Sequence, residues 1–264
     1  MARYGLIADI HGNREALAAA LAALDERGAE RIVCLGDIVG YNADPDECVA
    51  LVRERCSVSI AGNHELIGLG RLDFTRCSNK AEYALRRTRR TLGKEAAEFL
   101  KKLPDNHVLE PGVVLVHGGV RDVQQYMANP AHIIENARFL AADFPGARVC
   151  FFGHSHEQKV YEVTRDVKRD VDAVDVQEVA IDGQVSLRKE NTYFINPGSV
   201  DASRKKRHKL AECALFDSAF NTVQFLRVRY DAAATEAKAA AFGYRIDPLT
   251  DRLYTLRRRI GARF

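Results

Sequence analysis

The sequence predicts an α/β protein in which two sheets form a sandwich, and two observations support this fold class. Within residues 3–61, short apolar runs alternate with segments of helical periodicity, a pattern typical of parallel strands joined by helices. From residue 159 onward, short apolar runs are separated by turn residues such as Asp182-Gly183, which indicates antiparallel strands and hairpins. We therefore expect the first half to be doubly wound and the second half to complete the sandwich.

The first half of the chain contains an alternating series of strands and helices. Asn13 is the expected N-cap of the first helix and Gly28 its end, while Pro45 suits the first position of the second helix. The expected elements, in order, are a strand at 3–9, a helix at 14–27, a strand at 31–37, a helix at 45–55 and a strand at 57–61. Parallel pairing of these strands would bring their carboxyl ends to one edge of a sheet.

The middle of the chain is more helical, and the remainder is rich in short strands. Helices are expected at 77–91, 94–103 and 132–142, with strands at 113–117 and 148–153. Six more strands are expected at 159–164, 174–181, 185–188, 192–196, 211–216 and 223–228. The charged segment 164–175 is expected to be an exposed loop. We predict one domain over residues 1–230 and a helical tail over 231–264 that packs on it.

Composition restricts the class of protein. With 264 residues, of which 47% are hydrophobic and 28% charged, the chain can bury a full core. Its net charge of +3 does not require a nucleic-acid partner, although it fits an anionic substrate. No apolar run approaches the roughly 18–20 residues of a membrane span, so we expect no membrane partner. The six cysteines form no Cys-x-x-Cys pair, and reduced buried thiols would be typical of a cytoplasmic protein.

Five short motifs rich in aspartate, histidine and asparagine lie at the ends of expected strands. The motifs read DIHGN, GDIVGY, GNHE, HGG and GHSH, and their candidate functional residues are Asp9, His11, Asp37, Asn63, His64, His117, His154 and His156. One histidine at a strand end is usually not a ligand, but coincidence is a poor explanation for five such motifs. We therefore expect the fold to gather these side chains into one site.

The donor atoms of this set indicate the kind of metal that could bind. Imidazole nitrogens together with carboxylate and amide oxygens fit manganese, iron, zinc or nickel, and not an all-oxygen calcium or magnesium site. Without His64, the set still offers seven ligands, which exceeds the need of one ion with an open position. Two ions roughly 3.5–4 Å apart would use all seven and could hold a phosphoryl group for in-line displacement.

The five motifs, in this order over residues 9–156, resemble the calcineurin-like metallophosphoesterase superfamily. The segment NPGSV at 196–200 also resembles its bacterial YfcE-like phosphodiesterase branch. The resemblance implies a four-layer α/β/β/α sandwich of two mixed sheets flanked by helices, with a metal-bridging hydroxide as nucleophile. It implies that His64 protonates the leaving oxygen or stabilises developing charge. It implies two ligand sets that share one carboxylate: Asp9, His11, Asp37 and His156, and Asp37, Asn63, His117 and His154.

Four further positions also carry predictions. Asn13 could help to seat a phosphate near backbone donors, although its capping role alone accounts for it. Arg121 could bind the substrate phosphate, or it could be a solvated loop residue. Glu65 could orient His64 or a ligand, or lie at the surface. Ala61 stands where many related Ser/Thr protein phosphatases have an arginine, so the fit to that class is poorer.

We therefore predict a dinuclear metal-dependent phosphoesterase that acts on a small phosphodiester, phosphomonoester or nucleotide-like substrate. Substrate choice should depend mainly on the loops at 119–131 and 200–209. The basic run at 204–207 keeps a nuclease or dinucleoside polyphosphate hydrolase open as an alternative, with nucleic acid not favoured. A non-catalytic scaffold of the same fold is a second alternative, although all the ligands are retained. The basic run at 257–259 fits helix packing or a subunit contact, which leaves a homo-oligomer open.

Overall fold

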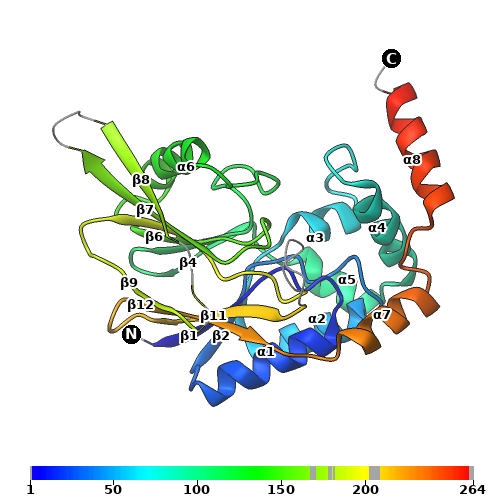
Figure 1. Cartoon of the computed structure of the whole chain (residues 1–264), viewed down its shortest axis with the longest axis horizontal. Helices are drawn as coiled ribbons and strands as arrows, with labels where there is room; N and C mark the ends of the chain where they lie inside the picture. The colour runs from blue at the N-terminus through cyan, green and yellow to red at the C-terminus, as the bar shows by residue number, and fades with distance from the viewer. Residues whose placement is uncertain (1, 167–170, 178–179, 181, 202–208, 262–264) are drawn as a thin grey trace.

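The computed structural model describes residues 2–166, 171–177, 180, 182–201 and 209–261 (Figure 1). The basic run at 204–207 lies outside these residues. The helices are α1 Arg14–Glu26, α2 Pro45–Arg55, α3 Asn63–Gly68, α4 Asn79–Thr91, α5 Lys94–Lys101, α6 Pro130–Asp143, α7 Ala232–Ala241 and α8 Pro248–Gly261. The strands are β1 Arg3–Ile7, β2 Arg31–Cys34, β3 Cys56–Ser59, β4 Asn106–Glu110, β5 Val113–Val116, β6 Val149–Phe151, β7 Lys159–Asp166, β8 Val171–Gln177, β9 Gln184–Ser186, β10 Thr192–Asn196, β11 Ala211–Asp217 and β12 Thr222–Val228.

The strands form two mixed six-stranded sheets within the described residues. The first sheet has the order β3-β2-β1-β11-β12-β9 and the second the order β4-β5-β6-β10-β7-β8. Strands β1, β2 and β3 pair in parallel, as do β5, β6 and β10, whereas the other pairings are antiparallel. Figure 1 shows α6 over the outer face of the second sheet and α1 and α2 over the outer face of the first. The predicted α/β sandwich of two mixed sheets flanked by helices is confirmed.

The two sheets and the helices on their outer faces form four layers, and three layers of apolar side chains lie between them. Along each strand, successive side chains point to opposite faces, so neighbouring residues enter different cores. Ile7 of β1 packs with α1 and α2, while its neighbour Leu6 lies between the two sheets. In the second sheet, Phe151 of β6 faces the first sheet, and Cys150 packs with the residues of α6. Burial of a leucine or isoleucine side chain contributes roughly 1.5–3 kcal/mol, so these layers hold the sandwich together.

The prediction of an exposed loop at 164–175 is wrong for the residues that the structure describes. Strand β7 continues to Asp166, and β8 begins at Val171 and pairs with it in antiparallel register. Strand β8 is the edge of its sheet, and charged side chains are common on edge strands because they oppose pairing with other chains. The same charges made the segment resemble a loop. The strand expected at 174–181 ends at Gln177, and residues 178–179 and 181 lie outside the described part.

Two elements were not predicted from the sequence. The edge strand β4 pairs with β5, and its residues are mostly half-buried or exposed, so they show little apolar pattern. Helix α3 forms at the end of β3, where no helix was predicted. Its first three residues are Asn63, His64 and Glu65, so the third motif is carried on the first turn of a helix. In addition, α6 begins two residues earlier than expected, because Asn129 caps it and Pro130 occupies its first position.

The C-terminal segment is helical, and side chains tie it to the first half of the chain. Thr235 of α7 donates a hydrogen bond to Asn13, and Lys238 forms ion pairs with Glu15 and Asp44. Helix α8 lies beside α4 and exposes a row of leucines at Leu249, Leu253 and Leu256. The division into a domain at 1–230 and a tail at 231–264 stays a prediction. Among the described residues, no helix is long and apolar enough to cross a membrane.

Candidate metal centre

The five motifs meet where the two sheets end. Three of them follow the parallel strands β1, β2 and β3 of the first sheet, and two follow the parallel strands β5 and β6 of the second. Parallel strands present their carboxyl ends on the same edge, which explains why residues far apart in sequence converge. All seven predicted ligands are buried, with exposed fractions of 7% or less: Asp9, His11, Asp37, Asn63, His117, His154 and His156.

One group of donor atoms comes from the first, second and fifth motifs. The Nε2 atoms of His11 and His156 are 3.0 Å apart, and His156 Nε2 is 3.4 Å from Oδ1 of Asp9. His11 Nε2 is 3.8 Å from Oδ2 of Asp37. Two ligand atoms that are each about 2.1 Å from one ion lie roughly 3.0–3.4 Å apart in octahedral or tetrahedral geometry. The spacing therefore fits a transition-metal ion among these four side chains.

A second group shares Asp37 with the first. His117 Nε2 lies 3.3 Å from Oδ1 of Asp37 and 3.2 Å from Oδ1 of Asn63. His154 belongs to this group, and its buried Nε2 atom has no hydrogen-bond partner among the described residues. A buried ring nitrogen of this kind is expected to have a partner, which a cation would provide. The two oxygens of Asp37 thus face different groups of histidines, as a bridging carboxylate would.

Backbone carbonyls orient three of the imidazole rings. A carbonyl oxygen can only accept, so each ring nitrogen bound to one carries the proton. His117 Nδ1 donates to Leu35 at 2.7 Å, while Nδ1 of His11 and of His64 both donate to Val39, at 3.3 and 3.1 Å. The Nε2 atom of each ring is therefore directed toward the centre of the site. Metal-binding histidines in proteins are held in this way.

Strained backbone is concentrated in the same motifs. Six residues other than glycine have positive φ angles of 53–61° here, a left-handed conformation that costs roughly 1–2 kcal/mol per residue: Asp9, His11, Asp37, Tyr41, His154 and His156. Such strain is found mainly at functional sites, where the surrounding structure maintains it. Glycines allow the close packing, because a Cβ atom on Gly62 would lie 2.2 Å from Oδ1 of Asp37. A Cβ atom on Gly40 would lie 2.2 Å from Nδ1 of His64.

The electrostatics of the cluster favour positive charge at its centre. Burial alone would raise the pKa of Asp37, but His117, His64 and His11 outweigh it and hold that pKa well below its usual range. Burial lowers the pKa of His117, yet the Asp37 charge dominates and raises the pKa to about 9. Burial, followed by the charge of His117, lowers the pKa of His154 to about 3, so this ring is neutral, as a metal ligand must be.

Glu65 lies beneath the site and not at the surface, so the surface alternative for it is wrong. It is fully buried, and its carboxylate accepts four backbone N–H bonds at 2.7–3.1 Å, from Asp37, Ile38, Val39 and Gly62. The carboxylate thus fixes the backbone around Asp37 and the Val39 carbonyl that accepts from His64. Burial and the Asp37 charge raise the pKa of Glu65 to about 7, while the backbone donors favour its ionised form.

Replacing Glu65 with glutamine should destabilise the protein by about 3 kcal/mol, because the new amide group would face two backbone donors and leave them unsatisfied. Urea unfolding of the metal-free protein at about pH 8.5, where Glu65 is ionised, measures this change. Glu98→Gln is the matched control, since Glu98 is exposed and pairs with Lys101 at the surface. Equal unfolding free energies for the two variants would contradict the structural role of Glu65.

The NPGSV segment also supports the site from below. Asn196 donates to the carbonyl of Gly153 at 2.7 Å, and Ser199 Oγ donates to the carbonyl of Asp9 at 3.0 Å. The amide of Val200 donates to the carbonyl of Ala8 at 2.9 Å. This segment therefore connects the first motif to the fifth through the carbonyls of Asp9 and Gly153 and the hydroxyl of Ser155.

The two residues predicted to bind substrate have other partners. Asn13 caps α1 by accepting from the amide of Ala16, and its amide group donates to Asp201 at 2.8 Å. Arg121 forms two hydrogen bonds with Asp143 at 2.6 and 2.7 Å and lies over the ring of Phe139 on α6. These contacts give the predicted phosphate-binding role of Arg121 and Asn13 no support.

The fold and the site together define a class, an α/β sandwich protein with a buried histidine–aspartate metal site at the ends of its strands. Residues 3–219 match the family model of the calcineurin-like phosphoesterase superfamily domain. The chain therefore belongs to the calcineurin-like phosphoesterase superfamily.

Individual relatives agree with this membership. The chain is 32% identical over 234 residues to an uncharacterized protein of Methanocaldococcus jannaschii, covering 86% of this chain and 87% of that protein. The crystal structure of a metallophosphoesterase from Sphaerobacter thermophilus superimposes with a TM-score of 0.73 at 30% identity, covering 95% of this chain and 97% of that one. A hypothetical protein from Pyrococcus horikoshii OT3 has the same fold, with a TM-score of 0.68 at 19% identity and coverage of 96% and 97%.

Proposed function

We propose that the protein is a dinuclear metal-dependent phosphoesterase that hydrolyses a small phosphodiester, phosphomonoester or nucleotide-like substrate. The observation that carries this proposal is the position of Asp37, whose Oδ1 lies 3.3 Å from Nε2 of His117 while Oδ2 lies 3.8 Å from Nε2 of His11. One ion would be held by Asp9, His11, Asp37 and His156, and the other by Asp37, Asn63, His117 and His154. The nitrogen and oxygen donors fit manganese, iron, zinc or nickel.

When bound, two such ions withdraw charge from the phosphoryl oxygens and activate the attacking water. The water gives one proton to solvent and its oxygen bonds to phosphorus, while the bond to the ester oxygen breaks and that oxygen takes up a proton. We assign this proton to Nε2 of His64, which would enter the reaction with both ring nitrogens protonated. Its Nδ1 is held by the Val39 carbonyl, and its Nε2 lies 4.0 Å from Oδ2 of Asp37, at the border of the site. Its ring is buried beside those of His11 and Tyr41.

The finer assignments are proposals as well. Membership of the YfcE-like branch rests on the NPGSV segment, and we retain it as a proposal. A nuclease or dinucleoside polyphosphate hydrolase remains an alternative to the small-ester hydrolase, and a scaffold without catalysis is disfavoured because every predicted ligand is present in the cluster. The exposed leucines of α8 could pack against a second copy of the chain, so a homo-oligomer is part of the proposal. The cytoplasmic localisation stays a prediction.

The proposed function is tested by activity after controlled metal loading. Protein stripped with EDTA and then loaded with Mn²⁺ should hydrolyse bis(p-nitrophenyl) phosphate, p-nitrophenyl phosphate or a nucleotide ester, and the EDTA-treated sample should lose at least about 99% of that rate. Single-stranded DNA is included in the panel to test the nuclease alternative. Equal rates before and after chelation, or no hydrolysis of any ester with any of the four metals, would contradict the proposal.

A further inference from the structure

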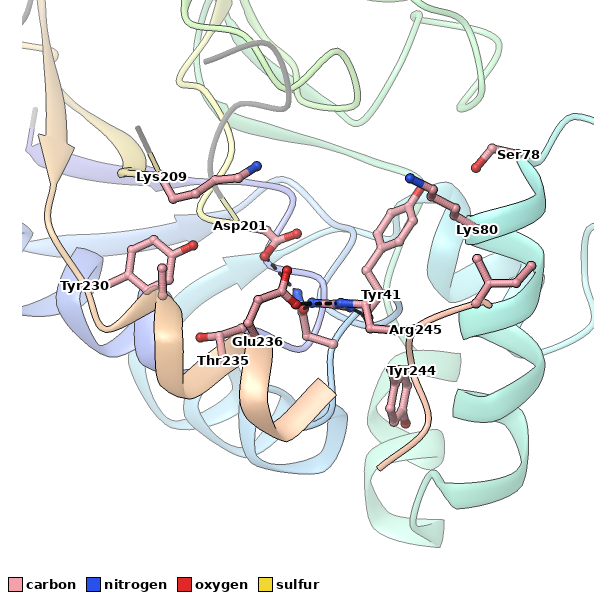
Figure 2. A pocket seen from close by; sticks show the side chains of 13 residues that line it. Tyr41, Ser78, Lys80, Asp201, Lys209, Tyr230, Thr235, Glu236, Tyr244 and Arg245 are labelled. Atoms are coloured by element: carbon pink, nitrogen blue, oxygen red, sulfur yellow. Dashed lines mark hydrogen bonds and ion pairs between the residues drawn. The ribbon is translucent and has the colours of Figure 1, made fainter. Parts of the chain in front are cut away.

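A cavity of about 390 Å³ lies next to the metal centre and has no role in the chemistry described so far (Figure 2). Its volume is within the roughly 300–1,000 Å³ range of small-molecule sites. Tyr41 joins the two regions, because it lines the cavity while its ring lies 4.7 Å from the ring of His11 and 4.9 Å from that of His64. A substrate whose phosphate occupies the metal centre would therefore extend into this cavity.

The C-terminal segment forms much of the cavity wall. The family match ends at residue 219, whereas Tyr230, Thr235, Tyr244 and Arg245 all line the cavity. Arg245 fixes this wall against the site, because it donates to the Tyr41 carbonyl at 2.8 Å and to Asn42 Oδ1 at 2.9 Å. The cavity is thus built partly from sequence outside the family domain, as expected for a feature that sets specificity.

Tyrosine rings supply much of the apolar part of the cavity wall. Figure 2 shows Tyr230 on one side of the cavity and Tyr41 and Tyr244 on the other. Tyr41 and Tyr230 each combine a flat apolar face with a hydroxyl group, which suits an aromatic ring that also carries polar atoms. Tyr244 is only 4% exposed and its hydroxyl bonds to Thr91, so it supports the wall from behind. An aliphatic ester group would use this surface less well, because stacking between rings adds to the gain from burial alone.

The cavity contains two exposed lysines together with the carboxylate of Asp201, which keeps its negative charge. Asp201 accepts hydrogen bonds from Asn13 and Asn42, both at 2.8 Å, and Glu236 pairs with Arg245. Lys80 and Lys209 are exposed and form no ion pair within the described part of the chain. In Figure 2 their side chains point into the space between them. Two ammonium groups there would attract an anionic group of the ligand.

We propose that this cavity binds the ester group of the substrate, and that this group is a nucleotide, with an aromatic base against Tyr41 and Tyr230 and a further phosphate at Lys80 and Lys209. The inference rests on the proposed phosphoesterase function and names its substrate class. From the sequence we predicted that the loops at 119–131 and 200–209 determine substrate choice. The cavity indicates that the segment from Tyr230 to Ile246 contributes to substrate choice as well.

Binding to the metal-free protein tests the cavity without depending on hydrolysis. Isothermal titration with ADP is compared with titration by pyrophosphate, which has the charge alone, and by adenosine, which has the ring alone. ADP should bind at least about tenfold more tightly than either. The double variant Lys80→Ala/Lys209→Ala should weaken ADP binding by at least about tenfold and leave adenosine binding unchanged. Tyr230→Leu should weaken adenosine and ADP alike.

The control variant Lys102→Ala/Lys189→Ala removes the same charge from two exposed lysines that do not line the cavity. It should bind ADP like the wild type. Equal ADP affinity in the two double variants, or ADP binding no tighter than pyrophosphate binding, would overturn the cavity assignment. If ADP binds as expected but no ester is hydrolysed after metal loading, the proposed function fails while the nucleotide site stands.

Discussion

The variant Asp37→Asn should bind both metal ions more weakly, with fewer than two ions retained per chain, and reduce kcat/KM by at least about 10³-fold. The physical reason is that the two carboxylate oxygens of Asp37 lie between the two groups of histidines, so neutralising this residue weakens both ligand sets at once. The amide oxygen of asparagine can serve one ion, but an amide nitrogen cannot ligate the other. Metal content measured by inductively coupled plasma mass spectrometry, together with steady-state kinetics, checks the prediction.

A loss of metal could also follow from a loss of structure, so the variant needs two controls. The first is its far-UV circular dichroism, which should match that of the wild type. The second is Asp73→Asn, which makes the same chemical change at an exposed residue outside the cluster. Asp73→Asn should retain full metal content and activity. An Asp37→Asn protein that still bound two ions per chain would show that Asp37 does not bridge them.

The variant His64→Ala should behave differently, with kcat reduced by about 10²–10⁴-fold while metal content stays unchanged. His64 Nε2 lies at the border of the cluster, 4.0 Å from Asp37, and its proposed task is to give a proton to the leaving oxygen. Loss of a proton donor should therefore depend on the leaving group. An alkyl ester needs that proton more than a p-nitrophenyl ester does, because p-nitrophenolate is a much weaker base.

The leaving-group dependence separates the proton-donor role from a structural one. We expect the rate loss for a methyl leaving group to exceed that for p-nitrophenol by at least about tenfold. His107→Ala is the matched control, since His107 lies on strand β4 and outside the metal cluster. An equal rate loss for both leaving groups would contradict proton donation, and a fall in metal content would place His64 among the ligands.

The sequence predicted the site better than it predicted the surroundings of the site, and the reason is physical. Each ligand motif is local, because a strand and the polar residues after it lie within a few positions, as in residues 3–11. Parallel pairing brings the motifs of each sheet to one edge, and stacking of the two sheets then brings Asp9 close to His156. Local motifs and the sandwich architecture were therefore enough to predict that these residues converge.

Contacts over long sequence distances were not predictable in the same way. Arg245 reaches Asn42 across 203 positions, and no local pattern marks either residue as part of one cavity. Glu65 was ambiguous because a glutamate on a helix is usually solvated, whereas here four backbone amides compensate for its burial. The β8 edge strand was missed because its charges, which suit an edge, are also typical of a loop.

Anomalous X-ray scattering from crystals loaded with Mn²⁺ tests the central claim most directly. Two peaks roughly 3.5–4 Å apart, each in contact with Asp37, are the expected result. One peak should lie among Asp9, His11 and His156, and the other among Asn63, His117 and His154. A single peak, or two peaks that do not share Asp37, would contradict a site built around two neighbouring cations.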